Sequence, residues 1–349
     1  MYILGIETSC DETAASVVKD GREILSNVVV SQIDIFKEYG GVIPEVAARN
    51  HLEVMLPVVN KALKDADLAW DEIDAIAVTH TPGLLGSLLI GTLTARTLAI
   101  LHDKPLYAVH HLKSHIYANW LSGQTPEFPL LALVVSGGHT QIIHMEEHNQ
   151  FEIIGTTRDD AVGECFDKVA KILGLPYPGG PSISKAAENG DPHKYHFPHP
   201  RLTSPNRGET KYSDLDFSFS GLKTAVLREV QKAVGKPISY PSHELKNLLT
   251  EQQVADFAAS FENTATDILL ENLRKALEKY PDTKSICVAG GVSANELLRE
   301  KAKSAFFPEK SLSGDNGAMV AAAAFYEIEK GVKPTDPYTL NIYPRKPIS

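Results

Sequence analysis

The apolar positions of this chain form two successive series of strand-like and helix-like segments in the same order. In the first series, an apolar run from Ile3 to Ile6 predicts a strand, small polar residues predict a turn, and a second strand follows. Asp20-Gly21 between two further apolar runs predicts a hairpin and a third strand that ends near Ser31. The pattern then predicts helices over about 44–65 and 86–101, and strands over 73–79 and 106–109.

The second series repeats this order in the second half of the chain. Strands are predicted over 130–135, 140–145, 151–157 and 285–289, and helices over about 161–173, 250–280 and 318–330, with a further helix starting near 294. A segment from 176 to about 241, rich in Pro, Gly and His, is interpreted as an insertion in this second series.

A meander of three strands followed by helix, strand and helix, present twice, predicts an α/β protein with a duplicated ribonuclease-H-like fold. This two-lobed architecture, shared by actin, Hsp70 and sugar kinases, has a mixed five-stranded sheet in each lobe. We expect residues 1–125 to form the N-terminal lobe, with a C-terminal helical segment at about 316–345 packed back on it. Residues 126–315 would form the C-terminal lobe, with its insertion at about 176–241. Ligands of such sheets gather at the carboxyl ends of the strands.

The net charge restricts how this chain can bind nucleic acid. Its formal value is −10, whereas a general nucleic-acid-binding surface is normally basic. RNA binding would therefore need a partner protein or a local basic patch, such as residues 193–211 with Lys194, Arg201, Arg207 and Lys211. Composition alone favours a Pro-rich surface loop for that segment over a phosphate-binding one.

Cysteine spacing and hydropathy indicate the cellular compartment in which this protein works. Cys10, Cys165 and Cys287 lie far apart without a CxxC pair, which argues against a disulfide framework or a thiolate metal site and fits a reducing, cytoplasmic setting. Glu7 interrupts the short apolar run at the N-terminus, so no signal peptide is expected. The longest apolar stretch, residues 84–101, contains an arginine and is too short and too polar to span a bilayer, so no membrane association is expected.

Turns of small residues follow predicted buried strands at residues 8–11, 136–138 and 290–295. Glycine allows backbone N–H groups to approach an anion without a Cβ in the way, and a helix that begins just beyond adds a favourable dipole. One such turn is at least as consistent with a tight structural turn. Their repetition at equivalent points favours a nucleotide held in a cleft between the lobes, although no Walker A pattern is present.

His111 and His115 form a candidate pair of metal ligands. On a helix, positions i and i+4 share a face, so both imidazoles can reach one ion, whereas His110 would point elsewhere. Asp315 is a candidate third ligand, but a role as a turn residue or as the N-cap of the last helix is a strong alternative. The HExxH signature is absent, and Lys113 stands where a catalytic Glu would be expected, which argues against metalloprotease chemistry.

Acidic residues near these turns offer further candidates. Asp11 and Glu12 can orient a cation, position a substrate or take a proton, and capping of an Asx-type turn accounts for them equally well. Asp167 is followed by a Pro-Gly-Gly-Pro turn at residues 178–181. A solvated charge and a loop explain these last two features without any function.

Taken together, these segments closely resemble the tRNA N6-adenosine threonylcarbamoyltransferase (TsaD) family, once labelled O-sialoglycoprotein endopeptidase. The resemblance covers nearly the whole chain. Its motifs, in order, are residues 5–13, 39–45, 135–140, 166–170, 216–224 and 290–295. So many long motifs in the same order are highly specific.

The resemblance implies transfer of a threonylcarbamoyl group from threonylcarbamoyl-AMP to the N6 amine of the adenosine 3′ to the anticodon. The product would be t6A in tRNAs that read ANN codons. It also implies ATP or threonylcarbamoyl-AMP as ligand, with Mg²⁺, and a separate synthase that makes the adenylate. TsaB-like and TsaE-like partner proteins are implied as well.

The resemblance also implies roles for individual residues. One divalent metal, Fe²⁺ or Zn²⁺, would lie on His111, His115 and Asp315, and Asp11 and Glu12 would be needed for activity. Binding of the nucleotide or adenylate would involve Ser9, Val134, Val135, Ser136, Gly137, Gly138, Asp167, Gly180, Ser184 and Asn295. The chain departs from the family pattern at residues 112–114, where Leu-Lys-Ser replaces Met-Glu-Gly, and at Ser184, where many members have Asp.

Two other classes of function are compatible with the predicted fold. A sugar- or acetate-kinase-like phosphotransferase would phosphorylate a small acceptor and would not need the histidine pair. A nucleotide-binding assembly subunit without chemistry would keep its function when either histidine is replaced.

Overall fold

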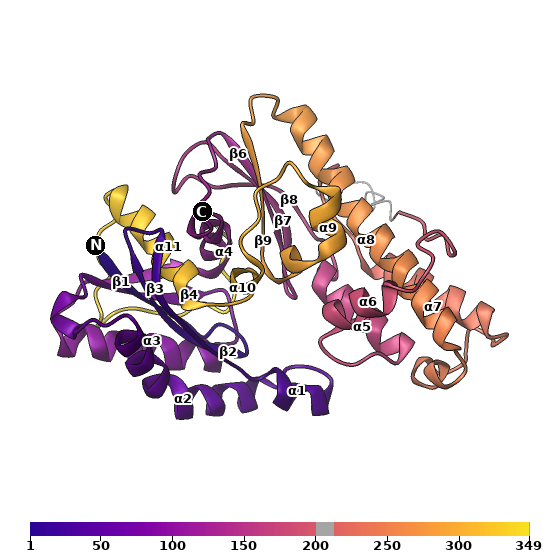
Figure 1. The fold of residues 1–349 in the computed structure, drawn as a ribbon, viewed down its shortest axis with the longest axis horizontal. Coiled ribbons are helices and arrows are strands. Elements are labelled where there is room, and N and C mark those ends of the chain that lie inside the picture. Colours follow the sequence, from indigo (N-terminus) through magenta and orange to yellow (C-terminus); the bar gives the residue numbers. More distant parts are fainter. Residues whose placement is uncertain (200–212, 349) are drawn as a thin grey trace, which may run out of the picture.

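Two β-sheets organise the chain, and the computed structural model describes residues 1–199 and 213–348 around them (Figure 1). The first sheet has the order β3-β2-β1-β4-β5. Its strands are β1 (Tyr2–Glu7), β2 (Glu12–Lys19), β3 (Glu23–Ser31), β4 (Ala75–Thr81) and β5 (Leu106–His110). The first three pair antiparallel, and β4 and β5 extend the sheet in parallel from β1, as the predicted meander and crossovers require.

The second sheet has four strands in the order β8-β7-β6-β9, so the expectation of five strands in both sheets is wrong for this one. Its strands are β6 (Leu130–Val135), β7 (Thr140–Met145), β8 (Glu152–Thr156) and β9 (Ser285–Ala289). Beside β9, where a fifth strand would lie, there is a single parallel bridge between Cys287 and Phe306. The next hydrogen bond to β9 would need a backbone N–H at residue 308. Pro308 has no N–H to donate, so the pairing with β9 stops there.

The helices form three layers around the sheets. They are α1 (Ile33–Tyr39), α2 (Pro44–Asp65), α3 (Leu85–Leu101), α4 (His111–Leu121), α5 (Val162–Leu173), α6 (Gly179–Ala187), α7 (Ser220–Ala233), α8 (Glu251–Lys279), α9 (Glu296–Lys301), α10 (Lys310–Ser313) and α11 (Gly317–Glu329). Helices α2 and α3 cover the outer face of the first sheet, α4 and α11 lie between the sheets, and α5 and α8 pack beyond the second sheet.

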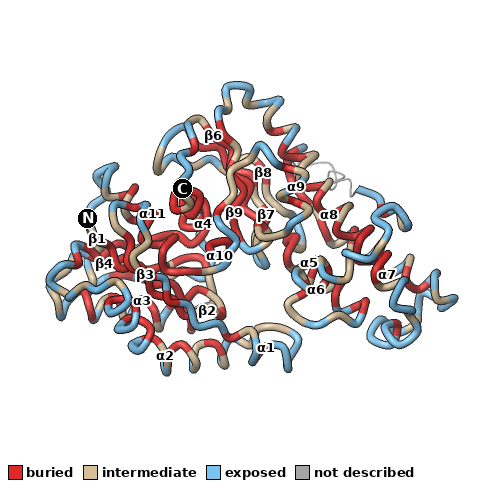
Figure 2. The backbone as a smooth tube through the Cα atoms, in the orientation of Figure 1, coloured by how far each residue is buried: buried red, intermediate tan, exposed pale blue. Residues whose placement is uncertain are grey.

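Strand alternation explains this layering, because successive side chains point to opposite faces of a sheet. In β1, Ile3 packs into the core between the sheets, whereas Leu4 packs into the core under α2 and α3. In β6, Leu130 faces the same central core and Leu131 faces α5 and α8. Figure 2 shows the result, with buried backbone concentrated in both sheets and in the helices between them.

Two glycines bring α11 onto the first sheet. A Cβ on Gly317 would lie 2.6 Å from the Gly5 carbonyl oxygen, so only glycine permits the backbone of the helix to approach β1 this closely. The N-terminal end of α11 is thereby placed next to the carboxyl end of β1. Residues far apart in the sequence meet there.

The predicted insertion at 176–241 is more regular than its composition indicates. It contains α6 and α7, and α6 packs against α5 and α8. The Pro-Gly-Gly-Pro sequence is the start of α6, where Pro181 falls in the first turn, a position in which proline costs no helical hydrogen bond. Arg201, Arg207 and Lys211 of the predicted basic patch lie outside the described residues. None of the helices in the described ranges has the length and apolar character needed to cross a membrane.

Candidate active site

A cleft of about 900 Å³ opens at the carboxyl ends of strands from both sheets. Its walls are formed by the turn after β1, the loop after β4, the start of α4, the turn after β6 and the segment 344–348. Of the residues predicted to form the site, Ser9, Asp11, Glu12, His111, Ser136, Gly137, Gly138, Asp167 and Asp315 line this cleft.

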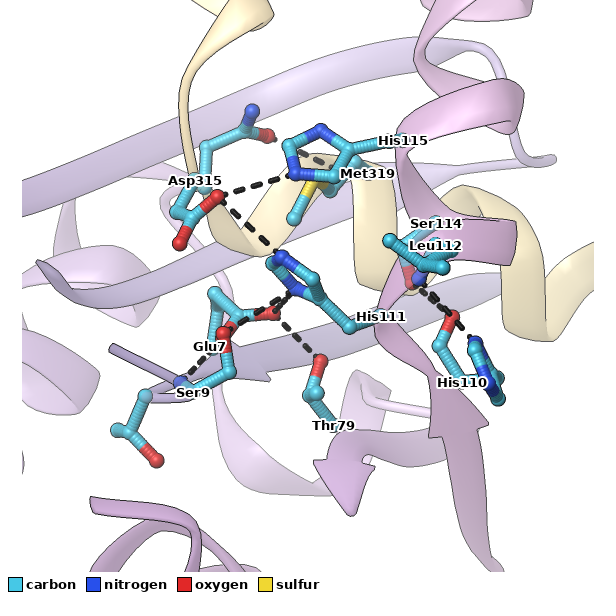
Figure 3. A network of polar contacts seen from close by, with 12 residues as sticks. Glu7, Ser9, Thr79, His110, His111, Leu112, Ser114, His115, Asp315 and Met319 are labelled. Atoms are coloured by element: carbon cyan, nitrogen blue, oxygen red, sulfur yellow. Dashed lines mark hydrogen bonds and ion pairs between the residues drawn. The ribbon is translucent and has the colours of Figure 1, made fainter. Parts of the chain in front are cut away.

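His111, His115 and Asp315 meet at the cleft floor, and their candidate ligand atoms all lie within 4.8 Å of one another (Figure 3). Both histidines project from the same face of α4. Asp315 Oδ1 lies 3.1 Å from His115 Nε2 and 3.6 Å from His111 Nε2. The N-cap of α11 is Asn316, whose Oδ1 accepts a hydrogen bond from the Met319 N–H at 3.0 Å. Asp315 is therefore free of the capping role that was its alternative explanation.

A buried carboxylate orients one of the two imidazoles. His111 Nδ1 lies 3.1 Å from Glu7 Oε2 and 3.2 Å from Ser9 Oγ. Thr79 Oγ1 donates to the same Glu7 oxygen at 2.6 Å, which fixes the carboxylate in place. With Nδ1 turned toward Glu7, Nε2 faces Asp315 and is available as a ligand, an arrangement common behind metal-bound histidines.

Electrostatics make this cluster a favourable place for a cation. Burial alone would lower the pKa of His111, but the Asp315 and Glu7 carboxylates outweigh it and raise the pKa to about 9. Burial alone would raise the pKa of Asp315, but His111 and His115 lower it to about 2. The cluster therefore holds positive charge strongly even before any metal is considered.

His115 provides the test of whether these residues fit a metal. Its side chain is buried, its Nδ1 has no hydrogen-bond partner among the described residues, and its Nε2 lies beside Asp315 Oδ1 at 3.1 Å. A buried polar atom without a partner is costly, and coordination would satisfy it. Two imidazoles and one carboxylate match the ligands that Zn²⁺ and Fe²⁺ accept, so the donor set fits a divalent metal.

Replacing Glu7 by glutamine should weaken metal binding without removing a ligand. The amide no longer attracts the His111 Nδ1 proton as a carboxylate does, so the imidazole is less well oriented and less basic. We expect a loss of about 10- to 100-fold in metal affinity, measured by competition with a chelator. Glu300→Gln, an exposed change on α9, is the matched control. Equal affinities for the two variants would show that Glu7 does not support the site.

Asp11 lies in the turn between β1 and β2, Glu12 is the first residue of β2, and both face the same cleft. Glu12 Oε1 accepts a hydrogen bond from Ser31 Oγ at 3.2 Å. Burial, together with the Asp315 and Asp11 charges, raises the pKa of Glu12 well above its usual range. A carboxyl group with raised proton affinity in a cleft is suited to proton transfer.

The residues predicted to bind nucleotide fall into three groups. Ser9, Ser136, Gly137, Gly138 and Asp167 line the cleft. Val134 and Val135 are fully buried in β6, where only their backbone can contribute. Gly180, Ser184 and Asn295 lie outside the lining of the cleft.

Ser184 and Asn295 belong to a separate polar cluster around Glu262. Ser184 Oγ donates to Glu262 Oε1 at 2.5 Å, and Asn295 Nδ2 donates to the same oxygen at 2.6 Å. The hydroxyl of Ser184 also accepts from Asn295 Nδ2 at 3.2 Å. This cluster joins α6, α8 and the start of α9, and it was not predicted as a unit. Glu262 lies within the long helix α8, and the residue pattern of that helix does not indicate which side chains Glu262 contacts.

Sequence reasoning missed several residues that the cleft brings together. Glu7 carried a usable signal, since a carboxylate inside an otherwise apolar strand needs a partner. His139, Tyr177 and the residues at 344–348 also line the cleft. They carried no such signal, because only the tertiary fold places them there.

A family model described as TsaD, tRNA N6-adenosine threonylcarbamoyltransferase, matches residues 23–322. The chain belongs to this family. A threonylcarbamoyltransferase from Symbiobacterium thermophilum is 49% identical over 339 residues, covering 95% of this chain and 93% of that protein. One from Bacillus cereus is 47% identical over 342 residues, with the same coverage. Membership of the threonylcarbamoyltransferase family makes this chain a transferase that forms t6A in tRNA, and a phosphotransferase is not favoured.

A solved structure agrees with the predicted fold. The activator of the 2-hydroxyisocaproyl-CoA dehydratase from Clostridium difficile with bound ADPNP has a TM-score of 0.50 and 13% identity, and covers 98% of this chain and 100% of that one. At this identity the likeness shows the fold alone. It confirms the two-lobed actin-like architecture predicted for this threonylcarbamoyltransferase.

The departure from the threonylcarbamoyltransferase pattern at residues 112–114 leaves both imidazoles in position. The Lys113 ammonium lies 3.9 Å from Glu327 Oε1 on α11. It also lies 4.8 Å from the centre of the Phe151 ring. The introduced charge is thus balanced outside the histidine–aspartate cluster. His110 also points away, since its Nε2 donates to the Lys346 carbonyl at 3.0 Å.

Proposed function

We propose that threonylcarbamoyl-AMP binds in the 900 Å³ cleft with its phosphate between the glycine turn after β6 and the metal ligands His111, His115 and Asp315. The adenosine of tRNA would then present its N6 amine to the carbamoyl carbon. The observation that supports this proposal is the convergence of a cation site, two carboxylates and a glycine turn on one cleft between two lobes.

The reaction is a substitution at the carbamoyl carbon. A bond forms between N6 and that carbon, the bond from the carbon to the phosphate oxygen breaks, AMP leaves, and N6 loses one proton. An aromatic amine is a poor nucleophile, so the rate depends on positioning and on stabilising the leaving phosphate. A bound Fe²⁺ or Zn²⁺ would supply Lewis-acid stabilisation of the developing charge.

The chain itself supplies anion donors and a proton acceptor. The backbone N–H groups of Gly137 and Gly138 donate to no acceptor among the described residues, and both glycines leave room for a ligand because an added Cβ would meet nothing within 4 Å. These donors can bind the phosphate. Glu12, on the opposite wall, takes the proton from N6 in this proposal, and Asp11 helps to position the substrate.

Reconstitution tests the proposed function directly. Purified protein is combined with TsaB-like and TsaE-like partners, unmodified tRNA, and either the synthase with threonine, bicarbonate and ATP or the preformed adenylate. Nucleoside mass spectrometry then measures t6A. Absence of t6A when the adenylate is supplied would exclude the proposed reaction at this cleft.

An exposed apolar face supports docking of the TsaB-like partner. It is made up of side chains from α2 and α3, which pack side by side, namely Leu52, Leu56, Leu85, Leu89 and Leu93. Leu52 is 69% exposed and Leu85 is 59% exposed. Contiguous apolar surface of this kind is typical of protein interfaces. A TsaE-like partner is proposed on the family resemblance alone.

Introducing charge into this face should prevent partner binding. A Leu52→Glu/Leu89→Glu variant would bury two unpaired carboxylates in the interface, and we expect at least about a 100-fold loss of affinity for the TsaB-like protein. Isothermal titration calorimetry measures it. Leu248→Glu changes an equally apolar, 40% exposed side chain in the other lobe and serves as the control. Unchanged binding by the double variant would place the partner elsewhere.

We propose residues 1–125 with 316–345 as one lobe and 126–315 as the other, which is supported by the packing of α11 on β1 and β2. We also propose a cytoplasmic location, where tRNA is available and where Cys10, Cys165 and Cys287 stay as the free thiols they are in the structure.

A further inference from the structure

The segment at residues 341–348 runs across the carboxyl ends of β4 and β5 and is held there by backbone hydrogen bonds. Tyr343 N donates to the His80 carbonyl at 3.1 Å, and Gly83 N donates to the Pro344 carbonyl at 3.2 Å. Ile348 is buried in the core between the sheets. With the His110 contact to Lys346 described above, these anchors fix the backbone on both sides of Arg345.

The side chains of residues 343–346 are exposed at or beside the mouth of the cleft. Tyr343 is 45% exposed, and Arg345 and Lys346 are exposed residues that line the cleft. Arg345 makes no hydrogen bond or ion pair with any described residue, and the Lys346 ammonium lies 5.4 Å from the centre of the Tyr343 ring. Neither cation forms an ion pair with a carboxylate in residues 1–199 or 213–348.

These two cations contrast with the rest of the cleft. Five carboxylates line it, from Asp11, Glu12, Glu164, Asp167 and Asp315, and among the described lining residues Arg345 and Lys346 are the only lysine or arginine. The whole chain has a net charge of −10. A polyanion that approaches this cleft therefore meets repulsion except along the segment at 343–346.

We propose that Tyr343, Arg345 and Lys346 form an RNA-contact strip that holds the anticodon loop at the mouth of the cleft. The guanidinium and the ammonium pair with phosphodiester oxygens, and the Tyr343 ring stacks on an unpaired base. Cations interleaved with an exposed aromatic ring are the means by which proteins bind single-stranded loops. This inference rests on the proposed function, because it assumes that the adenosine enters this cleft. The exposure of all three side chains favours RNA over the adenylate, whose phosphate would lie deeper.

Salt-dependent binding of tRNA tests the strip. The full complex with its metal and partners is titrated with labelled, unmodified tRNA by fluorescence anisotropy at several salt concentrations. Arg345→Gln/Lys346→Gln should weaken binding about 10-fold or more and reduce the slope of log K against log[salt] by about 1.4, or about 0.7 for each phosphate contact. Tyr343→Leu should weaken binding about 10-fold and leave the slope unchanged.

Two controls separate this effect from general loss of charge or folding. Lys284→Gln removes a charge from an exposed residue just before β9, at the amino end of that strand, whereas the cleft lies at the carboxyl ends. This variant should bind tRNA like the unaltered protein. Arg345→Lys keeps the charge and should keep the slope. Thermal unfolding establishes that each variant is folded.

The outcomes discriminate between the possibilities. If the double variant binds tRNA with unchanged affinity and unchanged salt slope, these residues do not form an RNA-contact strip. The same holds if the double variant loses affinity for threonylcarbamoyl-AMP while keeping that for tRNA, because the cations then serve the small substrate. Binding alone is measured, so an unaltered protein that binds tRNA through the strip but forms no t6A would contradict the proposed function and leave this inference standing.

Discussion

His115→Ala is expected to abolish stable metal binding and to lower the rate of t6A formation by about a thousandfold, because the charge stabilisation supplied at such a centre is worth several kcal/mol. His115 is buried on α4, its Nδ1 has no hydrogen-bond partner among the described residues, and its Nε2 lies 3.1 Å from Asp315 Oδ1. Alanine removes one of the three candidate ligands and leaves the Asp315 carboxylate with only His111 of the histidine pair. Metal content is measured by mass spectrometry after chelator treatment, and the rate by single-turnover assay with preformed adenylate.

The control for this experiment is His243→Ala. The His243 side chain lies in the other lobe and is 76% exposed. In the sequence it is distant from the residues that line the cleft. It should keep both metal and rate. Full metal content in His115→Ala would mean that the metal lies elsewhere, and a full rate without metal would remove the metal from the reaction.

Glu12→Gln is expected to lower kcat by about 100- to 10,000-fold with little change in KM, the usual range for loss of a general base. Burial first, and then the Asp315 and Asp11 charges, raise the pKa of Glu12 well above the ordinary glutamate range. A base works only when deprotonated, so activity is present above this raised pKa and is lost as pH falls through it. The acidic limb of the profile for the unaltered protein should therefore lie at higher pH than a free glutamate would give.

The pH profile of the variant decides the assignment. Glutamine has no proton to gain, so Glu12→Gln should lack the acidic limb that Glu12 produces. Glu164→Gln is the matched control, since Glu164 also lines the cleft but pairs with Lys168 at 2.8 Å one helical turn away. An unchanged acidic limb in Glu12→Gln would assign proton transfer to another group.

The regular elements of both lobes could be predicted from local pattern. The bounds predicted for α2, residues 44–65, agree with the structure because Pro44 stands at its first position and apolar residues recur at helical spacing behind it. The strands β6, β7 and β9 also agree, since each is a short apolar run between turn residues. These features depend on neighbours in the sequence.

Features that depend on distant neighbours were not predicted from pattern. The edge of the second sheet depends on which backbone N–H faces β9, and the missing N–H of Pro308 is recognised only once the register is known. The role of Glu7 depends on Thr79 and His111, and that of Glu262 on Ser184 and Asn295. Asp315 was a candidate third ligand from the sequence, with capping as a strong alternative, and only the family resemblance implied a metal on all three residues.

The close contact between Gly5 and Gly317 has a consequence for biosynthesis. The ribosome makes β1 first and the loop with Asp315 near the end, so the nascent chain carries two imidazoles without their carboxylate for most of its synthesis. The proposed set of three metal ligands is therefore complete only after α11 has docked on β1. A translation product that stops short of α11 would lack the helix whose docking on β1 holds Asp315 beside the two histidines.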